Sequence, residues 1–237
     1  MKFKFSIIKG KYIFIISLII FITIPFLSWS TEENNSNIEI LITKKNTDNF
    51  ENFQISKKVN LEESALIVIE ETMYDHSKIS EKKNKYFNEW VILPLIDFFK
   101  EKKSKIFLST NKKKNSIFYE QINKFDFVSL VKPDLSKYSQ REIIDIILGE
   151  NIKEVFLIGF EIDDVTHISP SSALHLSLRS INSNIIYDAI QTTEIVGDNM
   201  EDLNWIRTFG SIETLLHVKE ISKTTVESVL GDKNNEY

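Results

Sequence analysis

The 237-residue chain has no cysteine, and it has only six glycines and four prolines. Without cysteine the protein can form no disulfide, no thiolate metal site and no cysteine nucleophile. The few glycines form neither a G-x-G-x-x-G pattern nor a P-loop, which argues against a tight phosphate-binding loop. Positive charge is also scarce, since 29 basic residues face 34 acidic ones, and the formal net charge of −5 disfavours nucleic-acid binding. What is present, 42% hydrophobic and 27% charged residues, is the composition of a globular protein.

A basic and then apolar segment opens the sequence. Residues 1–11 contain four lysines and no acid, and residues 12–29 are apolar almost without interruption. This pattern predicts that residues 1–30 are a signal anchor or a signal peptide. The apolar run is long enough to span a bilayer, which favours an anchor, whereas Pro25 and the small residues Ser28 and Ser30 favour cleavage. We therefore expect the rest of the chain to be membrane-anchored on the extracytoplasmic side, or exported or periplasmic.

Three further parts are predicted after this segment. Residues 31–60 are mostly polar and predict a tether, with a short strand possible at 38–43 and a loop over 44–60. Residues 60–230 predict one domain, and residues 231–237 a polar tail. Apolar runs typical of buried strands alternate in this domain with segments of helical pattern.

The expected strands lie at residues 65–70, 105–110, 125–131, 154–159 and 184–188, with a last one between 218 and 230. The expected helices lie at residues 85–101, 116–122, 139–149, 171–180 and 199–217. Strands that alternate with helices form β-α-β units. The sequence therefore predicts an α/β fold: a three-layer α/β/α sandwich on a mostly parallel, Rossmann-like sheet.

Polar side chains follow the expected strands at their carboxyl ends, where open parallel sheets bind ligands. Glu70 and Glu71 follow the first strand, Thr110 the second and Lys132 the third. A lysine beside a carboxylate keeps it ionised, whereas burial prepares it to donate a proton, so Glu70 and Lys132 are candidates for an acid/base pair. Charged residues often follow strands for structural reasons alone, and a solvated or structural pair is the alternative.

The order of these segments resembles the isochorismatase-like, or cysteine hydrolase, superfamily. The run ALIVIE ending at Glu70 resembles the family's first strand, which ends in a catalytic aspartate. Lys132-Pro133, with Tyr138 six residues after the lysine, resembles the motif of the catalytic lysine. The similarity continues without a gap through the helix SQREIIDIILG to Gly159–Asp163, and then to Ala173 and to NIIYDA at residues 184–189. The resemblance spans about residues 37–230, and it implies the same α/β fold and catalytic roles for Glu70 and Lys132.

The departures from the family pattern concern its chemistry. Family amidases carry a nucleophilic cysteine six residues after the glycine, and here that position is Val165. Glu70 is one methylene longer than the aspartate it replaces. Thr166 carries a hydroxyl but lies one position too far along, which on a helix turns it by about 100°. The family's metal-binding variant needs an aspartate and histidines, and no complete set accompanies Asp75 and His76, so we expect neither a metal nor a cofactor.

Three functions remain open. The first is a catalytically degenerate, pseudoenzyme-like module that binds a small molecule or a protein partner. The second is a hydrolase that needs no cysteine, in which Glu70 protonates a vinyl ether or a related substrate and Lys132 assists. The third is a structural envelope protein with a filled pocket. Weaker candidates for substrate contact are Glu71, Thr110, Tyr138 and Thr166. The expected partners are such a ligand and the membrane, with no nucleic acid and a homo-oligomer as an option.

Two other clusters have simpler interpretations. Lysines at 100, 102, 103, 105 and 112–114 form either an anion-binding patch or a solvated helix end, and the helix end is favoured because cations stabilise a helix carboxyl terminus. Aromatic residues at helical spacing predict a core or oligomer face rather than a ligand cage; they are Tyr86, Phe87, Trp90, Phe98 and Phe99.

Overall fold

The computed structural model describes residues 36–70, 85–110, 128–130, 145, 147–149, 151–191 and 210–231. All of them belong to one compact unit, Ser36–Tyr237. Its strands are β1 (Asn37–Lys45), β2 (Asn52–Asn60), β3 (Ser64–Glu70), β4 (Lys105–Thr110), β5 (Val128–Leu130), β6 (Glu154–Phe160), β7 (Asn182–Gln191) and β8 (Ile221–Thr224). Its helices are α3 (Leu93–Glu101), α6 (Ala173–Ser177) and α8 (Val226–Leu230), with a 3-10 turn η1 (Leu61–Glu63) and two π-helical turns, η3 (Asn88–Ile92) and η4 (Asp164–Ile168).

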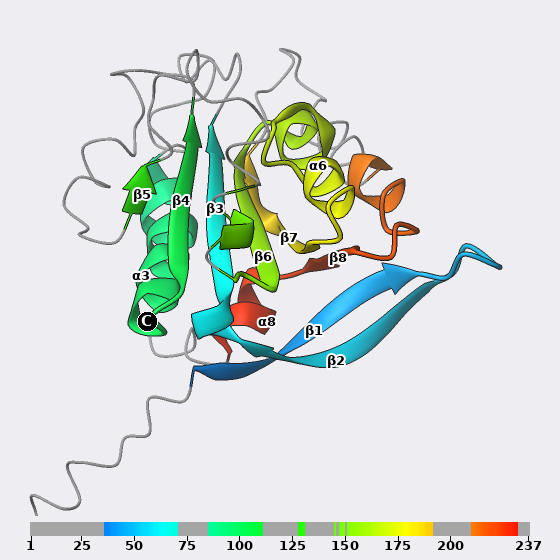
Figure 1. The fold of residues 1–237 in the computed structure, drawn as a ribbon, viewed down its shortest axis with the longest axis horizontal. Helices are drawn as coiled ribbons and strands as arrows, with labels where there is room; N and C mark the ends of the chain where they lie inside the picture. Colours follow the sequence, from blue (N-terminus) through cyan, green and yellow to red (C-terminus); the bar gives the residue numbers. More distant parts are fainter. Residues whose placement is uncertain are drawn as a thin grey trace, which may run out of the picture. The chain divides into compact units, whose positions relative to one another are not determined.

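The strands form one eight-stranded sheet in the order β2-β1-β8-β7-β6-β3-β4-β5 (Figure 1). Neighbouring strands from β8 to β5 run parallel. Only the β1–β2 hairpin departs from this direction: its strands pair antiparallel with each other, and β1 pairs antiparallel with β8. The predicted α/β class with a mostly parallel sheet is therefore confirmed.

Two apolar clusters cover the two faces of the sheet. Along β3, Leu66 and Val68 belong to the cluster that contains helices α3 and α8. Their neighbours Ala65, Ile67 and Ile69 belong to the other cluster, which contains α6. Because successive strand residues point to opposite faces, a strand that is apolar throughout is buried on both sides. The predicted three layers are thus present in the described residues, with α3 and α6 on opposite faces (Figure 1).

The hairpin corrects one prediction. Residues 44–60 were expected to form a loop, but β2 occupies Asn52–Asn60 and pairs with the whole of β1. Most residues of β2 are exposed, because it is an edge strand. Such a strand needs no apolar alternation, and its pairing with β1 overrides the polar composition. The short strand expected at 38–43 is confirmed, and it is longer at both ends.

The other predicted elements are present where they are described, but several bounds differ, and residues 214–217 of the helix expected at 199–217 form turns. Strand β4 has the expected bounds, β6 gains one residue and β7 is five residues longer than expected. The helix expected at 85–101 contains the π-helical turn η3 just before Pro94, whose missing N–H explains the local irregularity. The helix expected at 171–180 is shorter, because Ser172 is extended and caps α6. The helix expected at 116–122 and the apolar run 12–29 lie outside the described residues. Among the helices in the described part of the chain, none has the length and apolarity to cross a membrane.

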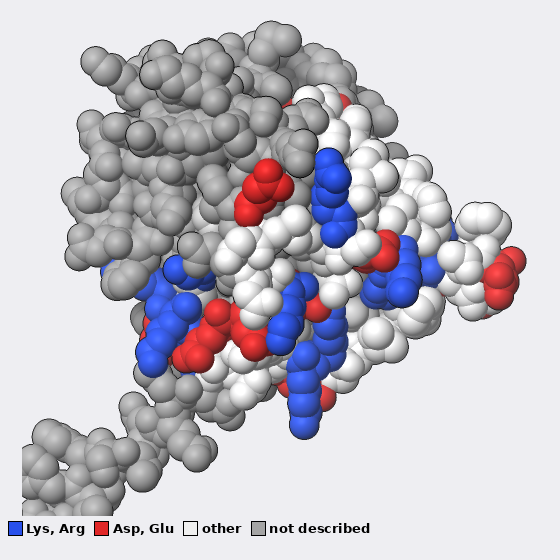
Figure 2. Space-filling view, in the orientation of Figure 1, with Lys and Arg blue, Asp and Glu red and all other residues white. Residues whose placement is uncertain are grey.

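The lysine cluster and the aromatic cluster of the sequence analysis are also partly described. Lys103 lies 3.8 Å from Glu62, and Figure 2 shows acidic and basic side chains interleaved on the face drawn, which supports a solvated helix end. Phe99 is buried and packs edge-to-face against Phe156 at 5.0 Å, as expected for core. Tyr86 and Trp90 instead stack on each other and are exposed.

Candidate functional site

The carboxyl ends of β3 and β6, named the β3–β6 crevice from here on, are where this topology would place a ligand. The two strands are neighbours and parallel. The helix that follows β3 packs on one face of the sheet, and the helices that follow β6 pack on the other. Where the connections that follow two neighbouring parallel strands pass over opposite faces of the sheet, their loops separate at the carboxyl ends of the strands. A ligand site forms at that point.

Glu70 ends β3 at this crevice. Its exposed fraction is 0%, and in the sheet it is the partner of Thr110 at the end of β4. By strand alternation its side chain lies on the face of Leu66 and Val68. Burying a carboxylate costs several kcal/mol unless polar or charged groups compensate it, so a structure keeps such a group only where it is held. The first predicted site residue therefore occupies the expected strand end and is shielded from solvent.

Gly159 brings β6 unusually close to β3. Its φ is +144°, and an ideal Cβ built there would lie 2.1 Å from the carbonyl oxygen of Ile69. Only glycine fits this approach. Two residues on, Glu161 also has a positive φ of 63°, and its N–H donates to the carbonyl of Gln191. The chain thus turns sharply out of β6 and directly into η4.

Val165 lies in η4, where the family resemblance places the nucleophile. Its exposed fraction is 0%, and it belongs to the apolar cluster with Ile69, Ile162 and Ala173. The side chain has no nucleophilic atom, and it contributes to the core beneath the crevice. An apolar residue in this position stabilises the fold through burial.

Thr166 does not replace the missing thiol. Its hydroxyl is buried and donates to the carbonyl oxygen of Ile162 at 2.7 Å. Oγ1 of Thr166 also lies 2.9 Å from Nδ1 of His167. Because the single hydroxyl proton is directed at the backbone, the imidazole must donate in this second contact and cannot act as the base that activates the oxygen.

A second serine–histidine contact has the same character. Ser172 Oγ lies 3.0 Å from Nδ1 of His175, but that nitrogen is also 2.7 Å from the carbonyl oxygen of Ser169. A carbonyl only accepts, so Nδ1 carries the proton and cannot take one from the serine. Ser172 is instead the N-cap of α6, as a helix-start residue should be.

Sequence reasoning missed a polar link between β4 and the segment before α6. Ser109 Oγ donates to Ser171 Oγ at 3.2 Å, and both residues are buried. The available signal was a serine next to last in an apolar strand. The link lies on the face of Val165, so it ties the end of β4 to the loop that precedes α6.

Other predicted site residues are only partly placed. Glu71, Lys132 and Tyr138 lie outside the described residues, and Thr110 is described through its backbone pairing alone. The pairing of Glu70 with Lys132 thus stays a prediction. Within the described residues, no group of three or more acidic, histidine or cysteine side chains is placed to hold a metal ion.

Eight chains of solved structures are similar to this one, and two of them represent the similarity. No known family profile matches the chain, and no curated protein matches its sequence. A nicotinamidase from Staphylococcus aureus is similar over 68% of this chain and 98% of its own, with 12% identity and a TM-score of 0.43. The MAR1 ribonuclease from Caenorhabditis elegans is similar over 73% of this chain and 81% of its own, with 15% identity and a TM-score of 0.47. The fold class of this chain rests on its own strand order, not on these alignments.

Proposed function

We propose that the chain is an isochorismatase-like domain that binds a small molecule at the β3–β6 crevice without covalent catalysis. The observation that carries this proposal is Val165, an apolar, fully buried residue at the position where the resembling family keeps its nucleophile. The hydroxyl of Thr166 is committed to the backbone, so the adjacent residue supplies no substitute. These two residues therefore favour a binding module that has lost the family's nucleophilic catalysis.

A second candidate is a hydrolase that relies on protonation. Glu70 supports it, because it places a carboxyl group, the kind of side chain that acts as a general acid, at a strand end beside the crevice. Lys132 would assist by placing positive charge near the substrate. Cleavage of a vinyl ether begins with protonation and needs no thiol, so Val165 does not forbid this reaction.

The location and partners of the domain form a separate proposal. The basic and apolar residues 1–30 support attachment to a membrane, with the domain on the extracytoplasmic side, or export after cleavage. Determining the amino-terminal residue of the mature protein decides between the two. We propose no nucleic-acid partner, in view of the acidic net charge, and self-association is tested by sedimentation of the purified chain.

A substrate panel of amides and vinyl ethers on the full chain in mild detergent tests the catalytic question. The binding-module proposal expects no turnover, together with a ligand that raises the Tm of the wild type and not of Glu70→Gln. Turnover that is abolished in both Glu70→Gln and Lys132→Ala would overturn it in favour of the protonation mechanism. Glu101→Gln, a change of the same kind at an exposed helix end, is the matched control and should behave as wild type.

A further inference from the structure

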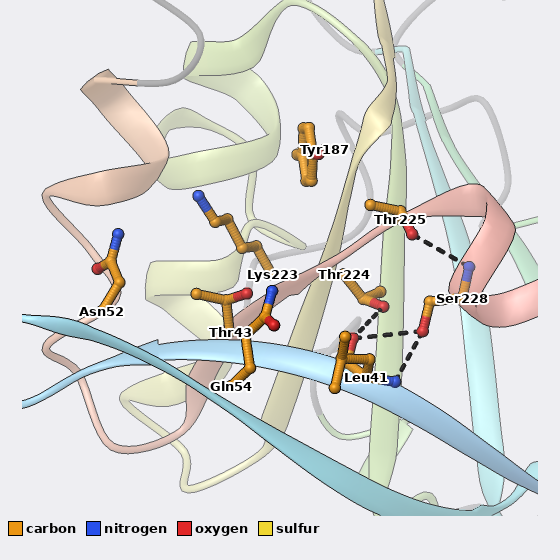
Figure 3. A pocket seen from close by; sticks show the side chains of 9 residues that line it. All are labelled: Leu41, Thr43, Asn52, Gln54, Tyr187, Lys223, Thr224, Thr225 and Ser228. Carbon is orange, nitrogen blue, oxygen red and sulfur yellow. Dashed lines mark hydrogen bonds between the residues drawn. The ribbon is translucent and has the colours of Figure 1, made fainter.

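We propose a second ligand site, in the cavity between the β1–β2 hairpin and β7, β8 and α8, that binds a neutral compound with several hydroxyl groups, of the size of a hexose sugar. The cavity has a volume of about 530 Å³, within the range of small-molecule sites (Figure 3). None of its lining residues comes from β3 or β6, so the site is separate from the β3–β6 crevice that contains Glu70 and does not rest on the function proposed there.

The lining of this cavity is polar. Among its nine residues, one has an aliphatic side chain, Leu41, and one an aromatic side chain, Tyr187. Six others carry hydroxyl or amide groups; they are Thr43, Asn52, Gln54, Thr224, Thr225 and Ser228. Most small-molecule sites are lined mainly by hydrophobic and aromatic residues with a few polar groups, and here the proportions are reversed. The lining therefore favours a ligand whose own surface is polar.

The one charged residue of the lining is held in an ion pair. Lys223 is buried, and its ammonium group is paired with the carboxylate of Glu213, which lies outside the lining. An anionic ligand would have to compete with Glu213 for Lys223, and a cationic ligand would be repelled by Lys223 itself. Because breaking a buried ion pair is costly, the lining favours a neutral ligand that leaves the pair intact.

The hairpin side of the cavity offers both hydrogen-bond donors and acceptors. Thr43 and Gln54 are direct partners in the β1–β2 register, so their side chains lie on the same face, and both line the cavity. Within the described residues, neither side chain has a hydrogen-bond partner. Asn52 donates through Nδ2 to Glu213, which leaves its Oδ1 as an acceptor. A ligand hydroxyl both donates and accepts, so a compound with several hydroxyls matches this mixture of groups.

The opposite wall adds a donor and is held in place by other residues. Oγ1 of Thr225 accepts from the N–H of Ser228, and a hydroxyl that accepts still has its own proton to donate. The hydroxyls of Thr224 and Ser228, in contrast, both donate to the carbonyl of Leu41 and hold the hairpin to β8 and α8 (Figure 3). These contacts fix the walls before a ligand binds, which lowers the ordering cost of binding.

Saturation-transfer difference NMR tests the site, with the full chain in a detergent that has no sugar headgroup. The probes are glucose, galactose and mannose, and citrate serves as an anionic comparison. We expect saturable binding of at least one hexose that citrate does not displace. Thr43→Val removes a hydroxyl at nearly the same shape and should weaken hexose binding about three- to tenfold, the effect of one hydrogen bond. Thr47→Val, the same change in the turn of the hairpin and outside the lining, should bind as wild type.

The outcomes that overturn the proposal are specific. Absence of saturable binding of all three hexoses would exclude the site, and displacement of the hexose by citrate would exclude a neutral ligand. Equal hexose affinities of Thr43→Val and Thr47→Val would show that the sugar does not contact Thr43. Glu70→Gln should leave the hexose affinity unchanged, and a loss in that variant would assign the sugar to the β3–β6 crevice instead. Circular dichroism shows whether Thr43→Val folds; if it does not, Gln54→Met on the exposed rim decides.

Discussion

At the scale of single residues, the contact between β6 and β3 depends on Gly159, which has no Cβ. Gly159 lets the backbone of β6 approach Ile69 of β3 at a distance that no Cβ allows. The atoms that a Cβ would meet are the oxygen, nitrogen and carbonyl carbon of Ile69, which belong to a central strand and cannot move aside. The positive φ of Gly159 adds a second reason against any other residue.

Gly159→Ala should therefore destabilise the protein strongly, by about 4 kcal/mol or more, which is at the upper end for point mutations. Gly149→Ala is the matched control, because nothing lies within 4 Å of a Cβ built there, and it should change stability by less than about 1 kcal/mol. Urea unfolding followed by circular dichroism measures both. Similar midpoints for the two variants would show that β3 and β6 can separate without cost.

At the scale of elements, one ion-pair cluster ties the hairpin to β8. Glu213 connects Lys223 of β8, Lys45 of β1 and Asn52 of β2. Burial acts to raise the pKa of Glu213, but the hydrogen bonds from Lys223 and Asn52 and the charges of both lysines outweigh it, so the pKa lies below its ordinary value. The native state thus favours the ionised carboxylate.

The lowered pKa of Glu213 determines how the stability of the fold should depend on pH. The stabilisation is complete above the ordinary pKa of 4.5 and is lost as the pH falls through the lowered native value. Glu213→Gln should cost about 3 kcal/mol at pH 7, because it leaves Lys223 buried without its carboxylate. Its stability should also fall less than that of the wild type between pH 6 and pH 3, roughly the range of a lowered glutamate pKa. Denaturant midpoints across this range, with Glu101→Gln as an exposed control, measure the effect; parallel curves would contradict it.

The elements also show what the sequence could reveal. Strands β3, β4 and β6 are buried on both faces, so their apolar runs predicted them from the sequence. The same runs predicted that Glu70 and Gly159 lie near the strand ends. Strand β2 could not be found in the same way, because an exposed edge strand carries no apolar pattern. The cavity beside Lys223 was missed for a related reason: it joins residues of β1, β2, β7, β8 and α8, and only the pairing of distant strands brings them together.

At the scale of the whole molecule, the hairpin is part of the domain and not a tether to it. Its residues Ile40, Ile42 and Val59 are buried in the cluster of α3 and α8. Removing the hairpin would expose apolar surface of that cluster and the edge of β8.

Two fragments test this view. Residues 36–237 should fold and unfold cooperatively, because they form one compact unit. Residues 61–237 should aggregate or lack a cooperative transition. Thermal unfolding by circular dichroism, with solubility after centrifugation, compares them. If the 61–237 fragment were soluble and unfolded cooperatively, the hairpin would be a linker that the fold does not need.

The pairing of β1 with β8 also determines when the sheet can form during synthesis of the chain. Leu41 bonds through its N–H to Ser228, 187 residues later in the chain. The hairpin is among the first described segments to be synthesised, and its partners β8 and α8 are the last. A sheet that joins its two ends cannot be completed until nearly all of the chain has left the ribosome. If residues 1–30 direct export, they would leave the ribosome well before the segments that complete the sheet.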